Sequence, residues 1–254
     1  MLSQETLTKP IVKLGNSAGV LLPRAWLGGQ AKIQLTEKPK NIKADILRIL
    51  EAHLEDIKGI YITGSHARNE ATPDSDVDVL VITEKTSKPI KQDPYEMILI
   101  TKEELEEELE EDLFPLYPMI AEAKAILNRD LLQRYKKTKI TKKNLRRKKE
   151  MIISALKITK GFIEMDKEDA CNTGDSIAYS LILNLRTIEI IKALKRKEIL
   201  TKKTLLQKIK TLTGSTEAYQ GYLRIKNQKK EKGSLPIKEA EALQAYIEKE
   251  VRNI

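Results

Sequence analysis

The stretch that most constrains this chain runs from residue 64 to residue 78, between two β-prone segments. The first segment, IYIT at 60–63, leads directly into Gly64-Ser65, and the second, VDVLVIT, occupies 77–83. A strand that enters Gly-Ser at a helix start places backbone N–H groups and a hydroxyl where an anion can bind. The stretch therefore predicts a phosphate-binding turn between a strand and a short helix.

Two aspartates stand at the start of the second segment. Asp76 and Asp78 alternate with valines, so the period-2 geometry of a strand points both carboxylates to one face. Adjacent carboxylates repel each other unless a cation lies between them, and hard oxygen ligands suit Mg²⁺ or Mn²⁺. Either half of the pattern alone favours a surface turn. Together, a phosphate-binding turn and a divalent metal site are what nucleotidyl transfer needs.

This stretch resembles the minimal nucleotidyltransferases of the polymerase β superfamily, whose pattern is Gly-Ser-x-Ala-Arg-Gly, a short spacer and Ser-Asp-x-Asp. The matching positions are Gly64, Ser65, Ala67, Arg68, Ser75, Asp76 and Asp78. The likeness extends loosely over about residues 42–133. Asn69 stands where the family usually has Gly, and Asn is the next most tolerant residue of left-handed backbone.

The resemblance implies a role for each matched residue. Asp76 and Asp78 would be catalytic and would hold the metal, Mg²⁺ or Mn²⁺. The nucleotide-binding set for a nucleoside triphosphate, with ATP as the expected one, would be Gly64, Ser65, Arg68 and Ser75. Glu96 in YEMILIT fits the family's third carboxylate, catalytic and metal-binding, although Asp is usual there. The alternative for Glu96 is a surface carboxylate on an edge strand.

The N-terminal 38 residues predict a small β module. Residues 11–35 fit short strands at IVKL, VLL and AKIQL around the Gly15-Asn16-Ser17 turn and Gly28-Gly29. The stretch KLGNSAGVLLPRAWL resembles the swapped-hairpin DNA-binding domain of the AbrB and MazE families, in which two chains interleave into one β-barrel. That resemblance implies a homodimer that contacts DNA. The alternative is a hairpin that packs on the next domain.

Taken as a whole, the sequence predicts an α+β protein of three domains: residues 1–38, residues 41–133 and residues 134–254. A linker is expected at 37–41. In the middle domain the patterns predict a helix at 42–57 ended by Gly59, strands at 60–63, 77–83, 95–100 and 121–127, and a helix at 102–112. Such strands and helices indicate a mixed sheet covered by helices. Helical periodicity at 142–165, 173–197, 201–212 and 236–252 predicts a C-terminal helical bundle.

The charge changes sign along the chain. The net charge is +4 over residues 1–40, −11 over 41–133 and +16 over 134–254. Basic segments are candidates for phosphate-rich partners, although abundant Lys and Glu also occur on solvated faces. The basic run at 134–150 fits either RNA or nucleotide contact, or an exposed helix face. Within the bundle, Asp175, Tyr179 and Arg186 fit an acceptor pocket, or else a helix cap and core packing.

Several classes of protein are excluded or disfavoured by the sequence. No apolar run approaches the roughly 20 residues of a membrane span, so we expect no membrane contact. The start MLSQETLTKP lacks the features of a signal peptide, and the single Cys171 fits a reducing compartment, so we expect a cytoplasmic protein. With only two histidines and one cysteine, a zinc site is not expected.

The sequence thus favours a metal-dependent nucleotidyltransferase that moves a nucleoside monophosphate to a hydroxyl of a protein, RNA or small-molecule acceptor. The alternative is an AbrB-like DNA-binding regulator, or an antitoxin, whose transferase fold senses nucleotides. Acceptor specificity depends on pocket shape rather than on the metal motif, so the acceptor stays open at this level.

Overall fold

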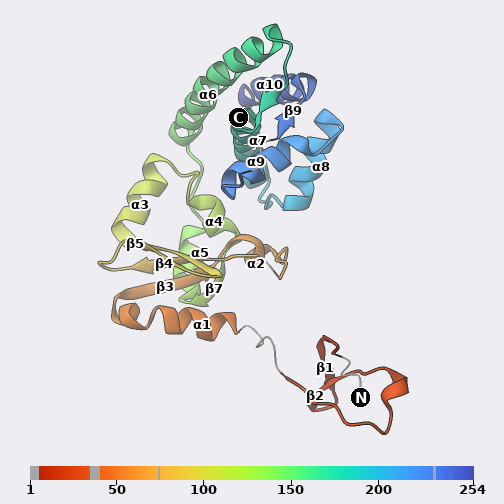
Figure 1. Cartoon of the computed structure of the whole chain (residues 1–254). Coiled ribbons are helices and arrows are strands. Elements are labelled where there is room, and N and C mark those ends of the chain that lie inside the picture. Colours follow the sequence, from red (N-terminus) through yellow and green to blue (C-terminus); the bar gives the residue numbers. More distant parts are fainter. Residues whose placement is uncertain (1–5, 35–40, 74, 231–232) are drawn as a thin grey trace. The chain divides into compact units, whose positions relative to one another are not determined.

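The structure is a computed structural model, and it describes residues 6–34, 41–73, 75–230 and 233–254 (Figure 1). It divides into two compact units, Met1–Asn41 and Ile42–Ile254. Most of the expected linker at 37–41 lies outside the described residues. The predicted domain limits at 38 and 133 remain predictions.

The first unit contains one β-hairpin. Its strands β1 (Ile11–Leu14) and β2 (Ser17–Val20) pair antiparallel with Leu14 opposite Ser17, and Gly15 takes the positive φ of 58° that the turn requires. A short 3-10 turn, η1, spans Arg24–Trp26. The second strand begins earlier than the expected VLL. Residues 31–34 form no strand, and Leu35 of the expected AKIQL strand lies outside the described residues.

The second unit is built on a five-stranded sheet. Its strands are β3 (Ile57–Ile62), β4 (Val77–Thr83), β5 (Lys88–Gln92), β6 (Tyr95–Thr101) and β7 (Lys124–Leu127). Their order is β5-β6-β4-β3-β7, with β4 and β6 parallel and the other pairs antiparallel. The sheet is therefore mixed, as the sequence predicts.

The strand alternation sorts two cores onto the two faces of this sheet. One core contains Val77, Val79 and Val81, which pack with Ile46 of α1 (Ile42–Ile49) and with Leu50, the residue that follows α1. Leu80 and Ile82 point the other way, into a core shared with α3 (Lys102–Glu111), α4 (Tyr117–Glu122) and α5 (Arg129–Tyr135). Asp78 is on this second face, at the end of the strand where the apolar residues stop.

Three expectations for this unit were wrong in detail. The helix expected at 42–57 ends at Ile49 and gives way to a 3-10 segment, η2 (Glu51–Asp56), in which Leu54 is 47% exposed rather than buried. Gly59 does not stop a helix but lies inside β3, where an added Cβ would collide with the Tyr61 ring. Residues 121–127 begin with the end of α4, and only Lys124–Leu127 form a strand.

The C-terminal segment is helical, as expected. Its helices are α6 (Lys142–Glu168), α7 (Asp175–Lys195), α8 (Lys202–Thr213), α9 (Glu217–Lys226) and α10 (Ile237–Val251). The two-residue strands β8 (Thr173–Gly174) and β9 (Ser234–Leu235) pair with each other, although no strand was expected beyond about residue 130. Central to the helical core are Leu181, Leu185 and Leu243, which are fully buried. None of the helices in the described part of the chain is both long enough and apolar enough to cross a membrane.

Candidate active site

The predicted turn meets one of the two predicted aspartates, Asp78, in the structure, while Asp76 is exposed just before β4. Gly64 begins the short helix α2 (Gly64–Arg68) with a positive φ of 65°, and a Cβ at Gly64 would lie 1.9 Å from Oδ2 of Asp78. The backbone N–H of Thr63 donates to the carbonyl of Asp78 at 2.9 Å, which fixes the turn against the strand. Glycine at position 64 thus allows the carboxylate of Asp78 to lie directly against the turn.

Other carboxylates surround Asp78. Burial raises the pKa of Asp78, the nearby Lys226 lowers it, and Glu96, Asp76 and Glu122 raise it further. Asp78 and Glu96 are direct neighbours in the parallel register of β4 and β6. An accumulation of negative charge beside a partly buried carboxyl favours a bound cation.

Glu96 is placed beside Asp78, but its side chain has another partner. It pairs with Lys91 on the edge strand β5, with Nζ and Oε1 2.7 Å apart, and its side chain is 46% exposed. The pKa of Lys91 is raised by Glu96 and, to a smaller extent, by the charge of Asp76. Glu96 therefore has features of both interpretations. It is a partly exposed carboxylate next to the edge strand, and it is also the neighbour of Asp78 in the register.

Arg68 is held by two carboxylates within the protein. Its Nη1 donates to Glu122 at 2.7 Å and its Nε donates to Glu70 at 2.8 Å. Although burial opposes the charged form, these hydrogen bonds raise the pKa of Arg68. The backbone N–H of Gly64 donates to the other oxygen of Glu122, also at 2.7 Å. The Glu122 carboxylate thus contacts two of the four residues that the resemblance assigns to the nucleotide, Gly64 and Arg68.

The remaining residues of the turn have mainly local partners. Ser75 accepts from the backbone N–H of Thr72 at 2.8 Å, so its hydroxyl closes the loop before the aspartates. Asn69 ends α2 in the left-handed conformation with φ of 58°, the conformation that asparagine tolerates next best after glycine. Ser65 is half-buried in α2. His66 is also half-buried, and its Nε2 has no hydrogen-bond partner among the described residues.

A cavity of about 570 Å³ opens beside this turn, between α2 and α4 on one side and α7 and α9 on the other. Glu122 and Arg68 form part of its wall. Glu122 contacts the backbone of Gly64, and Gly64 lies against Asp78, so the wall of the cavity is linked to Asp78 through Gly64. Arg186 lines it, as one reading of the sequence expected. Asp175 and Tyr179 do not: Asp175 pairs with Arg224, and Tyr179 packs against the helical core.

The family model for the nucleotidyltransferase domain matches residues 43–149, a segment that contains the turn, both aspartates, Glu96 and Glu122. Residues 43–149 are a nucleotidyltransferase domain. The match confirms the expected class of enzyme, a nucleotidyltransferase. A search of the curated proteins gives no match.

Two solved structures resemble the chain at low identity. A nucleotidyltransferase-like protein from Exiguobacterium sibiricum is 12% identical, with a TM-score of 0.37, over 83% of this chain and 73% of that one. The spectinomycin adenyltransferase AAD(9) of an Enterococcus, solved with ATP and spectinomycin, is 16% identical with a TM-score of 0.45, over 83% of this chain and 98% of that one.

The nucleotidyltransferase domain offers oxygen donors suited to a divalent cation, but they do not form a complete set of ligands. In the part of the chain that the structure describes, no three His, Cys, Asp or Glu side chains converge on one point. Asp78 with Asp76 supplies two carboxylates of the hard type that Mg²⁺ prefers. Burial, and after it the neighbouring carboxylates, raise the pKa of Asp78; that negative charge fits a bound cation, and Glu96 would join only by leaving Lys91.

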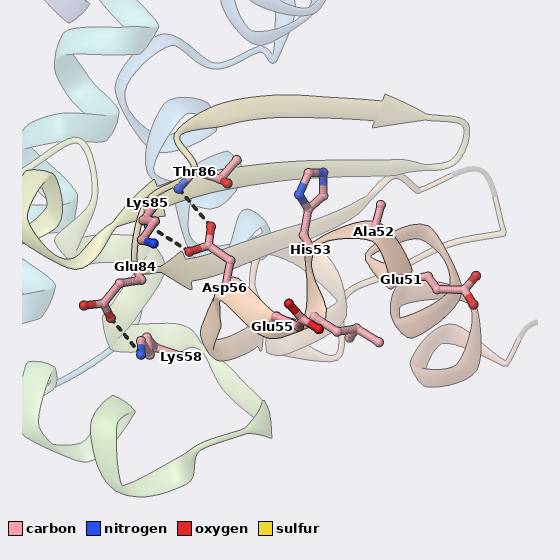
Figure 2. Close-up of a pocket in the computed structure, with 10 residues that line it drawn as sticks. Glu51, Ala52, His53, Glu55, Asp56, Lys58, Glu84, Lys85 and Thr86 are labelled. Atoms are coloured by element: carbon pink, nitrogen blue, oxygen red, sulfur yellow. Dashed lines mark hydrogen bonds and ion pairs between the residues drawn. The ribbon is translucent and has the colours of Figure 1, made fainter.

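A second cavity, of about 650 Å³, lies at the opposite end of the sheet (Figure 2). Residues of η2 and the segment after β4 line it. There Asp56 accepts from the backbone N–H groups of Lys85 and Thr86, at 2.8 and 2.9 Å, while Glu84 pairs with Lys58 (Figure 2). Asp78 is near the start of β4 and Glu84 follows its last residue, Thr83, so this cavity is at the other end of the strand from Asp78.

Proposed function

We propose that the protein transfers a nucleoside monophosphate from a triphosphate, with ATP as the expected donor, to a hydroxyl of an acceptor. The single observation that carries this proposal is the approach of the Gly64 turn to Asp78, because it brings an anion-binding backbone and a metal-binding carboxylate together. Asp76 and Asp78 would hold Mg²⁺ or Mn²⁺. Bound there, the cation would neutralise the triphosphate and activate the acceptor hydroxyl.

The residues of the chain divide the remaining work. Ser65 would bind phosphate, the backbone N–H of Gly64 would do so once Glu122 leaves it, and Ser75 would hold the loop that carries Asp76. Lys226 supplies a cation near Asp78 that no sequence pattern indicated. Arg68 is committed to Glu70 and Glu122, so in this proposal it orders the turn and meets phosphate only if Glu122 moves.

Glu96 would act on the acceptor. Glu96 is the β6 neighbour of Asp78 in the register, so once free of Lys91 its carboxylate would be placed to take the proton of the acceptor hydroxyl. In the transfer, the acceptor oxygen forms a bond to the α-phosphorus, the bond between the α- and β-phosphates breaks, and pyrophosphate leaves. Exchange of the Lys91 ion pair for a metal or substrate contact is the local change that this step requires.

The test is transfer of label from ATP labelled at its α-phosphate, with Mg²⁺, to the protein, to RNA and to small molecules of a lysate. Asp76→Ala and Asp78→Ala should each abolish transfer. Asp130→Ala, which removes an exposed aspartate from α5, is the matched control and should leave transfer unchanged. Equal labelling by wild type and the two site variants would refute the proposal.

A second candidate function concerns the first unit: a DNA-binding homodimer. None of the residues 6–34 is buried within the chain, and Leu21 and Leu27 are 64% and 80% exposed. Some 40 residues cannot bury a core alone, so this apolar surface favours a partner, and a second copy fits the swapped-hairpin resemblance. Residues 6–34 contain four basic and no acidic side chains, which suits DNA.

Changing both Leu21 and Leu27 to Asp tests this candidate in the full chain. Sedimentation should show a dimer for the wild type and a monomer for the variant, and binding to promoter DNA should weaken with added salt. A wild type that sediments as a monomer, or DNA binding that the double change leaves intact, would count against it.

A further inference from the structure

The cavity beside the active site carries more positive charge than its paired residues account for. Its acidic lining residues, Glu122 and Glu198, already pair with Arg68 and Arg196. Among its basic lining residues, Lys148 pairs with Asp112 at 3.0 Å. That leaves a set of cations on the wall that make no ion pair within the described residues: Arg186, Lys202 and Lys226.

These unpaired cations lie near aromatic rings. Tyr179, Tyr222 and Tyr219 form a stack, with centroids 5.4 and 5.7 Å apart in succession. Tyr219 and Tyr222 line the cavity, and Tyr219 is only partly buried. Arg186 is close enough to Tyr219 to act electrostatically on its hydroxyl. The wall thus combines an aromatic stack with free guanidinium and ammonium groups, the combination that binds nucleic-acid bases and phosphates.

The cavity also reaches the reacting centre. Glu122 lies on the wall and contacts the backbone N–H of Gly64, which in turn lies against Asp78. Lys226 lines the cavity and acts on the charge of Asp78. A molecule that stacks at Tyr219 therefore extends toward the aspartate pair. Its volume of about 570 Å³ is within the roughly 300–1,000 Å³ range of small-ligand sites.

We infer that this cavity takes the acceptor, and that the acceptor is a nucleotide, free or at the 3′ end of an RNA. The inference rests on the proposed nucleotidyl transfer and names its substrate class. A nucleotide supplies a base for the tyrosine stack, phosphate for Arg186 and Lys226, and a ribose hydroxyl as the attacking group. That hydroxyl oxygen forms the bond to the α-phosphorus of ATP, pyrophosphate leaves, and the proton passes to Glu96. Cationic acceptors are disfavoured because the unpaired charges on the wall are all positive.

Binding measured without ATP tests the cavity separately from catalysis. The probes are a short single-stranded RNA with a free 3′ hydroxyl, AMP, and a cationic aminoglycoside. Tyr219→Ala should weaken RNA and AMP binding about 5- to 140-fold, the loss of one stacking partner, whereas Tyr219→Phe should bind as wild type. Arg186→Gln should lower RNA affinity and reduce the slope of log K against log salt by about 0.7. Arg129→Gln, which changes an exposed arginine of α5 outside the cavity and outside the basic run at 134–150, is the matched control.

Transfer then decides between the sources of the nucleotide. RNA with an intact 3′ end should accept label from ATP and periodate-oxidised RNA should not; labelling of AMP but not RNA would identify a free nucleotide as acceptor. RNA and AMP binding that is absent, or unchanged in both Tyr219→Ala and Arg186→Gln, would overturn the inference. So would transfer to protein or aminoglycoside alone, which would leave nucleotidyl transfer itself intact. Absence of label from every acceptor would instead refute the proposed function. The binding results would still show whether the cavity binds a nucleotide.

Discussion

Replacing Gly64 with Ala should have two effects, one on the backbone conformation of the turn and one on the position of Asp78. The first is conformational: an L-residue at φ of 65° costs about 1–2 kcal/mol. For a unit of this size that cost lowers the melting temperature by about 2–8 °C. The second is steric, because the new Cβ would lie 1.9 Å from Oδ2 and 2.9 Å from Cγ of Asp78. Asp78 has to turn away, and a misplacement of about 1 Å can cost 100-fold in rate.

Gly214 offers a matched control in the same unit. It ends α8 with a φ of 81°, and a Cβ there would meet nothing within 4 Å. Gly214→Ala should therefore show a similar loss of melting temperature and wild-type transfer. Gly64→Ala should remain folded yet lose at least about 100-fold in transfer and bind Mn²⁺ more weakly by calorimetry.

The outcome that refutes this reasoning is specific. If Gly64→Ala keeps wild-type transfer and metal binding, the close approach of the turn to Asp78 does not matter for function. If Gly214→Ala loses transfer to the same extent, the loss comes from general destabilisation and not from the position of Asp78.

Three further predictions concern pairs that join distant segments. Glu122→Gln should lower the free energy of unfolding by about 1.5–3 kcal/mol in urea titrations, since it removes a charged partner of Arg68; an unchanged value would contradict the pairing. Asp175→Asn should cost a similar amount, because Asp175 accepts two bonds of 2.8 Å from Arg224. Arg224 holds the pKa of Asp175 below its ordinary 3.8, so this contribution is present above about pH 3.8 and is lost as the pH falls through the lower folded-state pKa; the variant should be less sensitive to acid there. Tyr61→Phe should cost about 1 kcal/mol by the same titration, because the buried hydroxyl donates to a backbone carbonyl at 3.1 Å.

Much of the sheet was predictable because its patterns are local. The strand at 77–83 was placed at its observed limits and that at 95–100 to within one residue, since both are apolar runs bounded by turn residues. β5 was missed because its sequence, Lys88–Gln92, holds one apolar residue and a proline, as suits an exposed edge strand. α9 was missed because Gly221 interrupts its pattern. In the structure a Cβ at that glycine would lie 2.8 Å from Cβ of Ala178, so glycine permits close packing against α7.

The sequence by itself determined the chemistry of the turn. Gly64, Ser65, Asp76 and Asp78 are near one another along the chain, and strand alternation places Asp78 on one face of β4, whereas Asp76 precedes that strand. Tertiary structure alone decided what surrounds them. Glu122 reaches Gly64 across 58 residues, and Lys226, at the end of α9, acts on the charge of Asp78. Such contacts form where packed elements meet, and neither periodicity nor spacing records which elements those will be.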